Sequence, residues 1–187
     1  MGIEKVRANF AIAVHWKAFP LHPEIPAEGL LLKEVYATLG VDSAQAAARV
    51  KKVAAGLGLP LAEREKTYNS RLAQELGKWA EEKGKGDAFH DALFKAYFAE
   101  AKNISDPAVL AEIVKALGLP EKEAREAMEQ GIYRTAVDAD WRLAAQLEIT
   151  CVPTFVFAND AIEGLQPYEA LERFLLEKGV KRVKRGA

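Results

Sequence analysis

The feature that most constrains the fold is a long run of helical pattern between two short segments of strand pattern. Residues from about 30 to 147 carry apolar side chains at helical spacing, interrupted by glycine stops and proline starts. The segment FAIAVHWKAF alternates apolar and small or polar residues, which predicts a strand over Ala11–Phe19. The segment VPTFVF predicts a strand over Val152–Phe157, followed by a turn, a short strand and a closing helix. This order predicts the α/β class.

The domain organisation follows from the same order. We expect one domain over residues 1–187, because no internal repeat or low-complexity segment divides the chain. The helical stretch of about 30–147 is then an insert, and residues 2–20 and 148–179 form the two halves that flank it. A loop with three prolines, PLHPEIPAEG, connects the first half to the insert.

Composition excludes several classes of function. The chain has 26 Lys and Arg against 27 Asp and Glu, so it lacks the basic character of a nucleic-acid binder. No apolar run approaches the length of a membrane span, and no secretory leader pattern opens the sequence. The only cysteine, Cys151, permits neither an internal disulfide nor a structural zinc site. We therefore expect a cytoplasmic protein without a metal, without nucleic-acid or membrane partners.

Four segments together resemble the DsbA family of thioredoxin-like oxidoreductases, in its FrnE-like cytoplasmic branch. They are WKAFPLHPEIPAEG, YNSRLAQELGKWAEEKGKGDAFHDALFKAYF, VDADW and VPTFVF, and the resemblance runs from about Gly2 to Lys178. The resemblance implies a thioredoxin-like α/β fold with a large all-helical insert, and partners that carry protein or peptide thiols and disulfides. It also implies a cis bond between Val152 and Pro153, which leaves the Val152 backbone free to pair with an extended substrate.

The chain departs from the family where the family's chemistry lies. Members begin with a central strand and a Cys-Pro-Trp-Cys type motif, and both are absent from this chain. Thiol–disulfide turnover needs an attacking thiolate and a second thiol that resolves the mixed disulfide. The oxidoreductase assignment therefore rests on resemblance, and we expect no dithiol catalysis from these 187 residues. The missing strand also predicts poor stability or self-association as a homo-oligomer.

Three readings of the function stay open. The gene product begins upstream of Met1 and encodes the missing motif, or the chain is a redox-inactive thioredoxin-like module that binds peptides or a partner. In the third reading it is a glutathione-dependent isomerase or transferase of the kappa-class type, which would make glutathione the one candidate cofactor. The third reading needs a residue at the same missing N-terminal position.

The candidate site is a run of four residues. Cys151 is the catalytic candidate, as a monothiol only; the competing interpretation is a small buried core residue. Val152, Pro153 and Thr154 are the predicted substrate-binding residues, following the family motif.

The other polar candidates favour structural roles. His15, His22 and His90 do not form a metal-binding pair at helical spacing, so we expect hydrogen-bonded structural residues. Asp138 and Asp140 stand two apart on a predicted helix and point to different faces, which favours caps or salt bridges over an acid–base pair.

An aromatic stripe runs along the segment DAFHDALFKAYFAE, which Asp87 is expected to cap. Phe89, Phe94, Tyr97 and Phe98 recur on one broad helical face, so we predict that they belong to the core of the insert.

Overall fold

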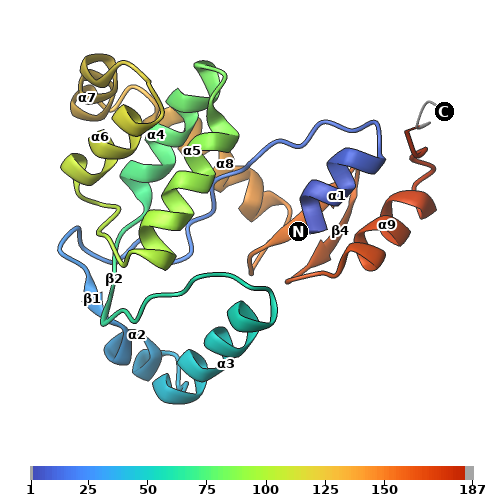
Figure 1. Ribbon diagram of the computed structural model, residues 1–187, viewed down its shortest axis with the longest axis horizontal. Coiled ribbons are helices and arrows are strands. Elements are labelled where there is room, and N and C mark those ends of the chain that lie inside the picture. Colours follow the sequence, from blue (N-terminus) through green and yellow to red (C-terminus); the bar gives the residue numbers. More distant parts are fainter. Residues whose placement is uncertain (1, 184–187) are drawn as a thin grey trace. The chain divides into compact units, whose positions relative to one another are not determined.

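The computed structural model describes residues 2–183; residue 1 and residues 184–187, the ends of the predicted domain, lie outside the described range. The chain forms two compact units, residues 1–21 with 140–187 and residues 22–139 (Figure 1). The second unit corresponds to the predicted insert, with ends at 22 and 139 where the sequence pattern suggested about 30 and 147. The single domain with an insert remains a prediction. The class is helix-rich α/β, as predicted.

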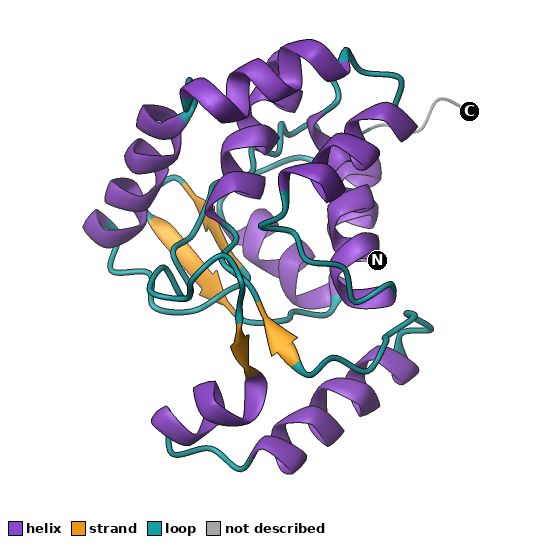
Figure 2. Cartoon of the chain, turned by 90° about the vertical axis from the view of Figure 1, so that its left-hand side faces the viewer, coloured by secondary structure: helices purple, strands orange, loops and turns teal. Residues whose placement is uncertain are grey.

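The described residues contain helices throughout and four short strands. The helices are α1 Gly2–Asn9, α2 Leu32–Thr38, α3 Ser43–Gly56, α4 Arg71–Glu82, α5 Gly86–Phe94, the π-helix η1 Lys95–Ala99, α6 Pro107–Ala116, α7 Glu121–Gln130, α8 Arg134–Gln146 and α9 Tyr168–Glu177. The strands are β1 Leu30–Leu31, β2 Lys66–Thr67, β3 Thr154–Phe157 and β4 Asp160–Glu163. They form two separate antiparallel pairs, β1 with β2 and β3 with β4 (Figure 2).

The first unit is built on the β3–β4 hairpin. Its register pairs Phe155 with Ile162, and a two-residue loop joins the strands. Because side chains alternate along a strand, Phe155 and Phe157 share one face of the hairpin. That face packs on a small core made by α1 and α9, whose buried members are Val6, Phe10, Leu171 and Leu175. The side-chain Nδ2 of Asn9 also donates a hydrogen bond of 3.0 Å to the Tyr168 hydroxyl, which joins the two helices.

The predicted strand over Ala11–Phe19 is wrong. The segment lacks strand pairing, and a bridge between Phe10 and Arg182 is the nearest contact of that kind in the described residues. The alternation nevertheless shows which side chains are partly buried. Ile12, Val14 and Trp16 are half-buried, and the residues between them are exposed. A strand needs a hydrogen-bonded neighbour, which the sequence pattern of one segment cannot supply. β3 pairs with β4 alone among the described strands, so this segment does not fill the gap in the sheet.

The second unit has its own helical core. Asp42 caps α3 by accepting a hydrogen bond of 2.8 Å from the Gln45 amide. The predicted Asp87 cap is wrong, because α5 begins at Gly86 with Lys85 as its N-cap, so Asp87 lies within the first turn. The core is formed mainly by α4 to α7, and its largest fully buried side chains include Leu76, Phe89, Leu110 and Val114.

The aromatic stripe belongs to the core only in part. Phe89 is fully buried, whereas Phe94 and Phe98 are 48% and 37% exposed. The α-helix passes into the π-helix η1 at Lys95, and the wider turn of a π-helix shifts which side chains face inward. Tyr97 on η1 contacts Arg64, whose guanidinium carbon lies 4.1 Å from the centre of the Tyr97 ring.

His90 on α5 gives a prediction about pH. Burial lowers the pKa of His90 below its ordinary value of 6.5, and the nearby Glu81 carboxylate, 3.9 Å from Nε2, opposes that shift. The unfolded chain therefore binds a proton on this ring that the folded chain does not, as the pH falls through 6.5. We expect the free energy of unfolding to decrease as the pH is lowered through that range.

The test combines NMR titration of the His90 ring with urea unfolding above and below the ordinary histidine pKa. His90→Gln should flatten this part of the stability profile, while His15→Gln, which removes an exposed histidine, is the control. A His90 pKa above the ordinary value, or equal effects of the two substitutions, would contradict burial as the cause.

Candidate functional site

The predicted site residues lie in the loop that leads from α8 into β3. The peptide bond between Val152 and Pro153 is cis, the form expected from the resemblance. The Pro153 carbonyl accepts a hydrogen bond of 2.7 Å from the amide of Gly164, the residue after β4. The Thr154 hydroxyl donates to the Cys151 carbonyl at 2.7 Å. The hairpin therefore holds the loop from one side.

Cys151 carries a free thiol that is partly accessible to solvent. Its sulfur lies 3.6 Å from Oε2 of Glu163, to which the thiol can donate, and 3.9 Å from the Thr154 hydroxyl. Reactive cysteines usually lie beside cations or at helix N-termini, and this sulfur instead contacts a carboxylate. The Cys151 thiol is therefore accessible to a reagent, but its contacts within the described residues do not include the positive charge that usually activates a cysteine.

Val152 presents an open backbone beside this thiol. Its side chain is 46% exposed, and within residues 2–183 neither its N–H nor its carbonyl has a hydrogen-bond partner. The strand that follows it, β3, is paired along one edge by β4 and has no strand on its other edge in the described structure. Donors and acceptors along this edge are therefore available to a further extended chain.

Glu163 is the site residue that sequence reasoning missed. The strand register places it opposite Thr154, on the last pair of the hairpin. Residues 158–159 form the loop of the hairpin, and this loop sets the register that brings Glu163 beside Cys151. A hairpin with a two-residue loop gives the correct pairing, and this was the available signal.

Asp140 of the VDADW segment is buried and structural. Its carboxylate accepts a hydrogen bond of 2.9 Å from the Ala18 amide and pairs at 3.1 Å with the Lys17 ammonium. These contacts hold the end of the extended segment 11–19 within the first unit. The salt-bridge interpretation is confirmed for this residue.

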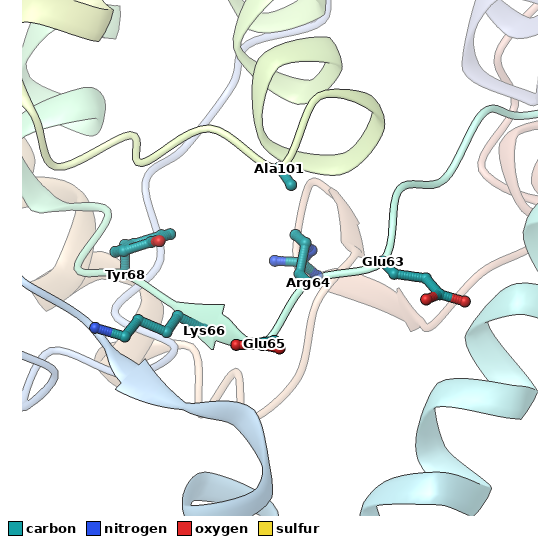
Figure 3. Close-up of a pocket in the computed structure, with 6 residues that line it drawn as sticks. All are labelled: Glu63, Arg64, Glu65, Lys66, Tyr68 and Ala101. Atoms are coloured by element: carbon teal, nitrogen blue, oxygen red, sulfur yellow. The ribbon is translucent and has the colours of Figure 1, made fainter.

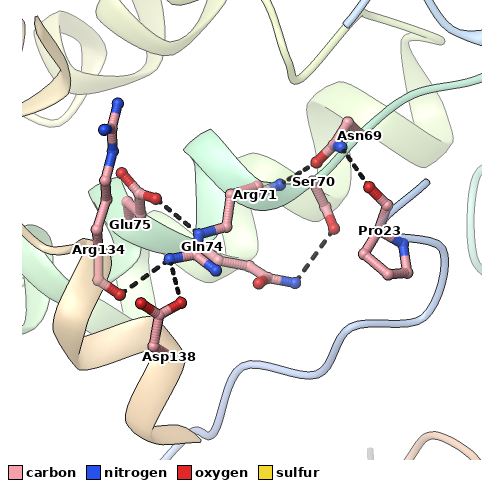
Figure 4. A network of polar contacts seen from close by, with 8 residues as sticks. All are labelled: Pro23, Asn69, Ser70, Arg71, Gln74, Glu75, Arg134 and Asp138. Carbon is pink, nitrogen blue, oxygen red and sulfur yellow. Dashed lines mark hydrogen bonds and ion pairs between the residues drawn. The ribbon is translucent and has the colours of Figure 1, made fainter. Parts of the chain in front are cut away.

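Asp138 has separate partners in the second unit. Its carboxylate lies 2.7 Å from Nη2 of Arg71, and that guanidinium also pairs with Glu75 at 2.6 Å (Figure 4). The Arg134 carbonyl accepts a further hydrogen bond of 2.9 Å from the same guanidinium. Each of the two aspartates is therefore engaged in its own ion pair, as predicted.

Residues 2–183 show neither a metal-binding cluster nor a membrane-spanning helix. No group of three or more His, Cys, Asp or Glu side chains there could hold a metal ion. His22 lies 3.3 Å from the Glu24 carboxylate, His90 is partly buried beside Glu81, and His15 is exposed. In the same range, no helix combines the length and the apolar character that crossing a membrane requires.

Comparison with known proteins identifies the class. The DSBA-like thioredoxin domain family matches residues 1–176. A probable DsbA oxidoreductase from Streptomyces coelicolor has a similar structure, with a TM-score of 0.84 and 28% identity over 98% of this chain and 83% of that one. The fold is thus that of the DsbA-like thioredoxin proteins, and the chain belongs to this family.

Other relatives are more distant. The uncharacterized Bacillus subtilis protein YwbO is 28% identical over 112 residues, which are 59% of this chain and 56% of that protein, so the match spans little more than half of the relative. A putative protein disulfide isomerase from Nitrosomonas europaea has a TM-score of 0.62 and 19% identity over 72% of this chain and 74% of its own. A 2-hydroxychromene-2-carboxylate isomerase has a TM-score of 0.63 and 16% identity over 81% and 70%. These last two share the fold alone.

The two aspartates provide a matched pair of substitutions. Asp140→Ala removes a buried carboxylate and leaves the Ala18 amide without its acceptor, while the Lys17 side chain is 55% exposed and can be hydrated, so we expect a loss of about 2 kcal/mol in the free energy of unfolding. Asp138→Ala removes a side chain that is 47% exposed, and should cost about 0.5 kcal/mol. Urea unfolding measures both.

Asp140→Asn refines the comparison, because it keeps an acceptor for the Ala18 amide and removes only the charge. It should lose less stability than Asp140→Ala. Equal losses for Asp138→Ala and Asp140→Ala would show that burial of Asp140 does not matter.

Proposed function

We propose that this chain binds extended peptides that carry a thiol or disulfide, along Val152 and the open edge of β3. The observation that carries the proposal is Val152, an exposed residue whose backbone has no hydrogen-bond partner within residues 2–183, beside the accessible thiol of Cys151. Pro153 and Thr154 shape the loop in which both groups lie. Membership of the DsbA-like family supports protein thiols as the class of partner.

The binding mode is the addition of a strand. An extended peptide lying antiparallel to the loop satisfies the Val152 N–H and carbonyl, and continues along β3. Each such hydrogen bond contributes a net 0.5–1.5 kcal/mol, roughly. A short edge therefore gives weak, reversible binding, which suits a protein that meets many partners.

The chemistry available to one thiol is a single exchange. The Cys151 thiolate attacks one sulfur of a peptide disulfide, a new disulfide forms between Cys151 and the peptide, and the other sulfur leaves as a thiolate. Release requires an external thiol, because the chain has one Cys in total. We therefore propose a peptide-binding module that forms mixed disulfides and does not complete a dithiol cycle by itself.

The proposed location is the cytoplasm, as in the FrnE-like branch that the sequence resembles. A protein with one cysteine is suited to a reducing compartment, where its thiol stays free. Glutathione is the abundant external thiol that such a compartment supplies for release of the peptide.

A disulfide-trapping assay tests the proposal. A peptide whose cysteine is linked to thionitrobenzoate should form a 1:1 mixed disulfide with Cys151 and release the coloured thiolate, while Cys151→Ser should release none. The same peptide with N-methylated backbone amides should react more slowly, by about fivefold for each hydrogen bond lost. Mass spectrometry confirms the adduct.

Insulin reduction is the companion measurement. The wild-type chain should show no turnover above that of Cys151→Ser, because no second thiol resolves the adduct. Equal trapping of the two peptides would overturn binding by strand addition. Insulin turnover that persists in Cys151→Ser would place the activity elsewhere.

A further inference from the structure

A small pocket lies in the second unit, between the segment before β2 and the turn after η1. It has a volume of about 190 Å³ and is lined by Glu63, Arg64, Glu65, Lys66, Tyr68 and Ala101. Figure 3 shows Arg64 and Tyr68 on opposite sides of this space, with Ala101 above, while Glu63 and Lys66 extend away from Arg64. The pocket is separate from the loop around Cys151 in sequence and belongs to a different unit.

Arg64 is the residue that makes this pocket unusual. Its guanidinium carbon lies 4.1 Å from the Tyr97 ring centre and 5.1 Å from that of Phe98. Stacking on aromatic rings fixes the plane of the guanidinium and leaves its edge of N–H donors free. Nη1 is buried, yet it has no hydrogen-bond partner within residues 2–183. A buried donor of this kind costs stability unless another group satisfies it.

The backbone around the pocket is also irregular. Tyr97 and Phe98 lie on the π-helix η1, and π-helices are rare and frequent at functional sites. Ala101, which lines the pocket, has a φ of 53°, in the left-handed region that residues with a Cβ seldom adopt. The Tyr97 hydroxyl is fixed by a contact of 2.9 Å with Thr67 on β2. The hydrogen bond with Thr67 thus fixes the Tyr97 ring that the Arg64 guanidinium contacts.

We propose that this pocket binds a carboxylate group through the edge of the Arg64 guanidinium. The planar fork of Arg matches a carboxylate with two parallel hydrogen bonds. The Tyr68 hydroxyl is the second polar group of the lining that can donate. This inference is independent of the proposed function of the Cys151 loop.

The charge of the lining and the volume of the pocket narrow the class of ligand. The lining carries two carboxylates and two cations, and therefore no net charge, which favours a singly charged carboxylate over a phosphate dianion. The Lys66 ammonium reaches the Glu28 carbonyl at 3.4 Å, and Glu63 pairs with Lys51 at 3.7 Å. Arg64 and Glu65 are the charged side chains of the lining without a polar partner within residues 2–183, and Arg64 is the one of the two that can bind an anion. Pockets for drug-sized ligands span about 300–1,000 Å³. This smaller one fits a single carboxylate-bearing group, from a free acid or a peptide C-terminus.

NMR titration of the full chain with sodium acetate tests the site, with sodium chloride and sodium phosphate at matched ionic strength as comparisons. Acetate should shift the Arg64 side-chain N–H signals and the amides of Tyr68 and Ala101 in a saturable way, and chloride should not. Arg64→Gln should weaken acetate binding by at least about tenfold. Lys66→Gln, which removes the same charge from the same lining, should weaken it less than about twofold.

A folding check, a third variant and two peptide ligands complete the test of this site. Near-ultraviolet circular dichroism checks that both variants fold, and Arg64→Lys, which keeps the charge without the fork, should also bind more weakly than wild type. An acetylated dipeptide acid that binds while its amide does not identifies a peptide C-terminus; acetate binding without dipeptide binding identifies a free acid. Absence of a saturable acetate shift, or equal effects of Arg64→Gln and Lys66→Gln, would overturn the proposal. Pairing of Arg64 with Glu65 in the free protein, revealed when Glu65→Gln shifts its signals, would also overturn it.

Discussion

The hairpin of β3 and β4 depends on one apolar face packed against α1 and α9. A two-stranded hairpin by itself is at best marginally stable in water, so the contact of Phe155, Phe157 and Ile162 with this helix pair keeps it folded. The loop around Cys151 in turn depends on the hairpin, through the bond from the Gly164 amide to the Pro153 carbonyl. Loss of the packed face would therefore remove the order of the candidate site as well.

The proposed peptide binding depends on the second edge of β3, which has no strand beside it in the described structure. Exposed strand edges pair readily with other chains, and proteins usually cover them. Here the edge continues into Val152, whose backbone is open, and it begins beside the free thiol of Cys151. In the proposed function, this chain binds extended peptides but does not complete a dithiol cycle by itself, because it has a single cysteine. This edge is also where the sequence predicts self-association, because a second copy can supply a strand.

The sequence predicted local features better than pairing between distant segments. Helical spacing located the helices of the second unit, because that spacing depends on residues three and four apart along one segment. The strand over Ala11–Phe19 failed because alternation reports which side chains are buried, and not whether a neighbouring strand exists. Glu163 was missed because its place beside Cys151 is set by the register of the hairpin.

The pocket at Arg64 could not be predicted from sequence for a similar reason. Aromatic spacing placed Phe94 and Phe98 in the core, but the π-helix turns these rings outward, where one of them stacks with a guanidinium from before β2. The unsatisfied Nη1 of Arg64 arises from that tertiary arrangement.

Amide hydrogen exchange along residues 148–164 is the most direct measurement of the central claim. An open binding edge predicts that the Val152 amide exchanges at close to the rate of an unstructured chain, while the β3 amides bonded to β4 are protected. Protection of Val152 equal to that of the paired β3 amides, in the free and monomeric protein, would show that the edge is already covered and would contradict the account.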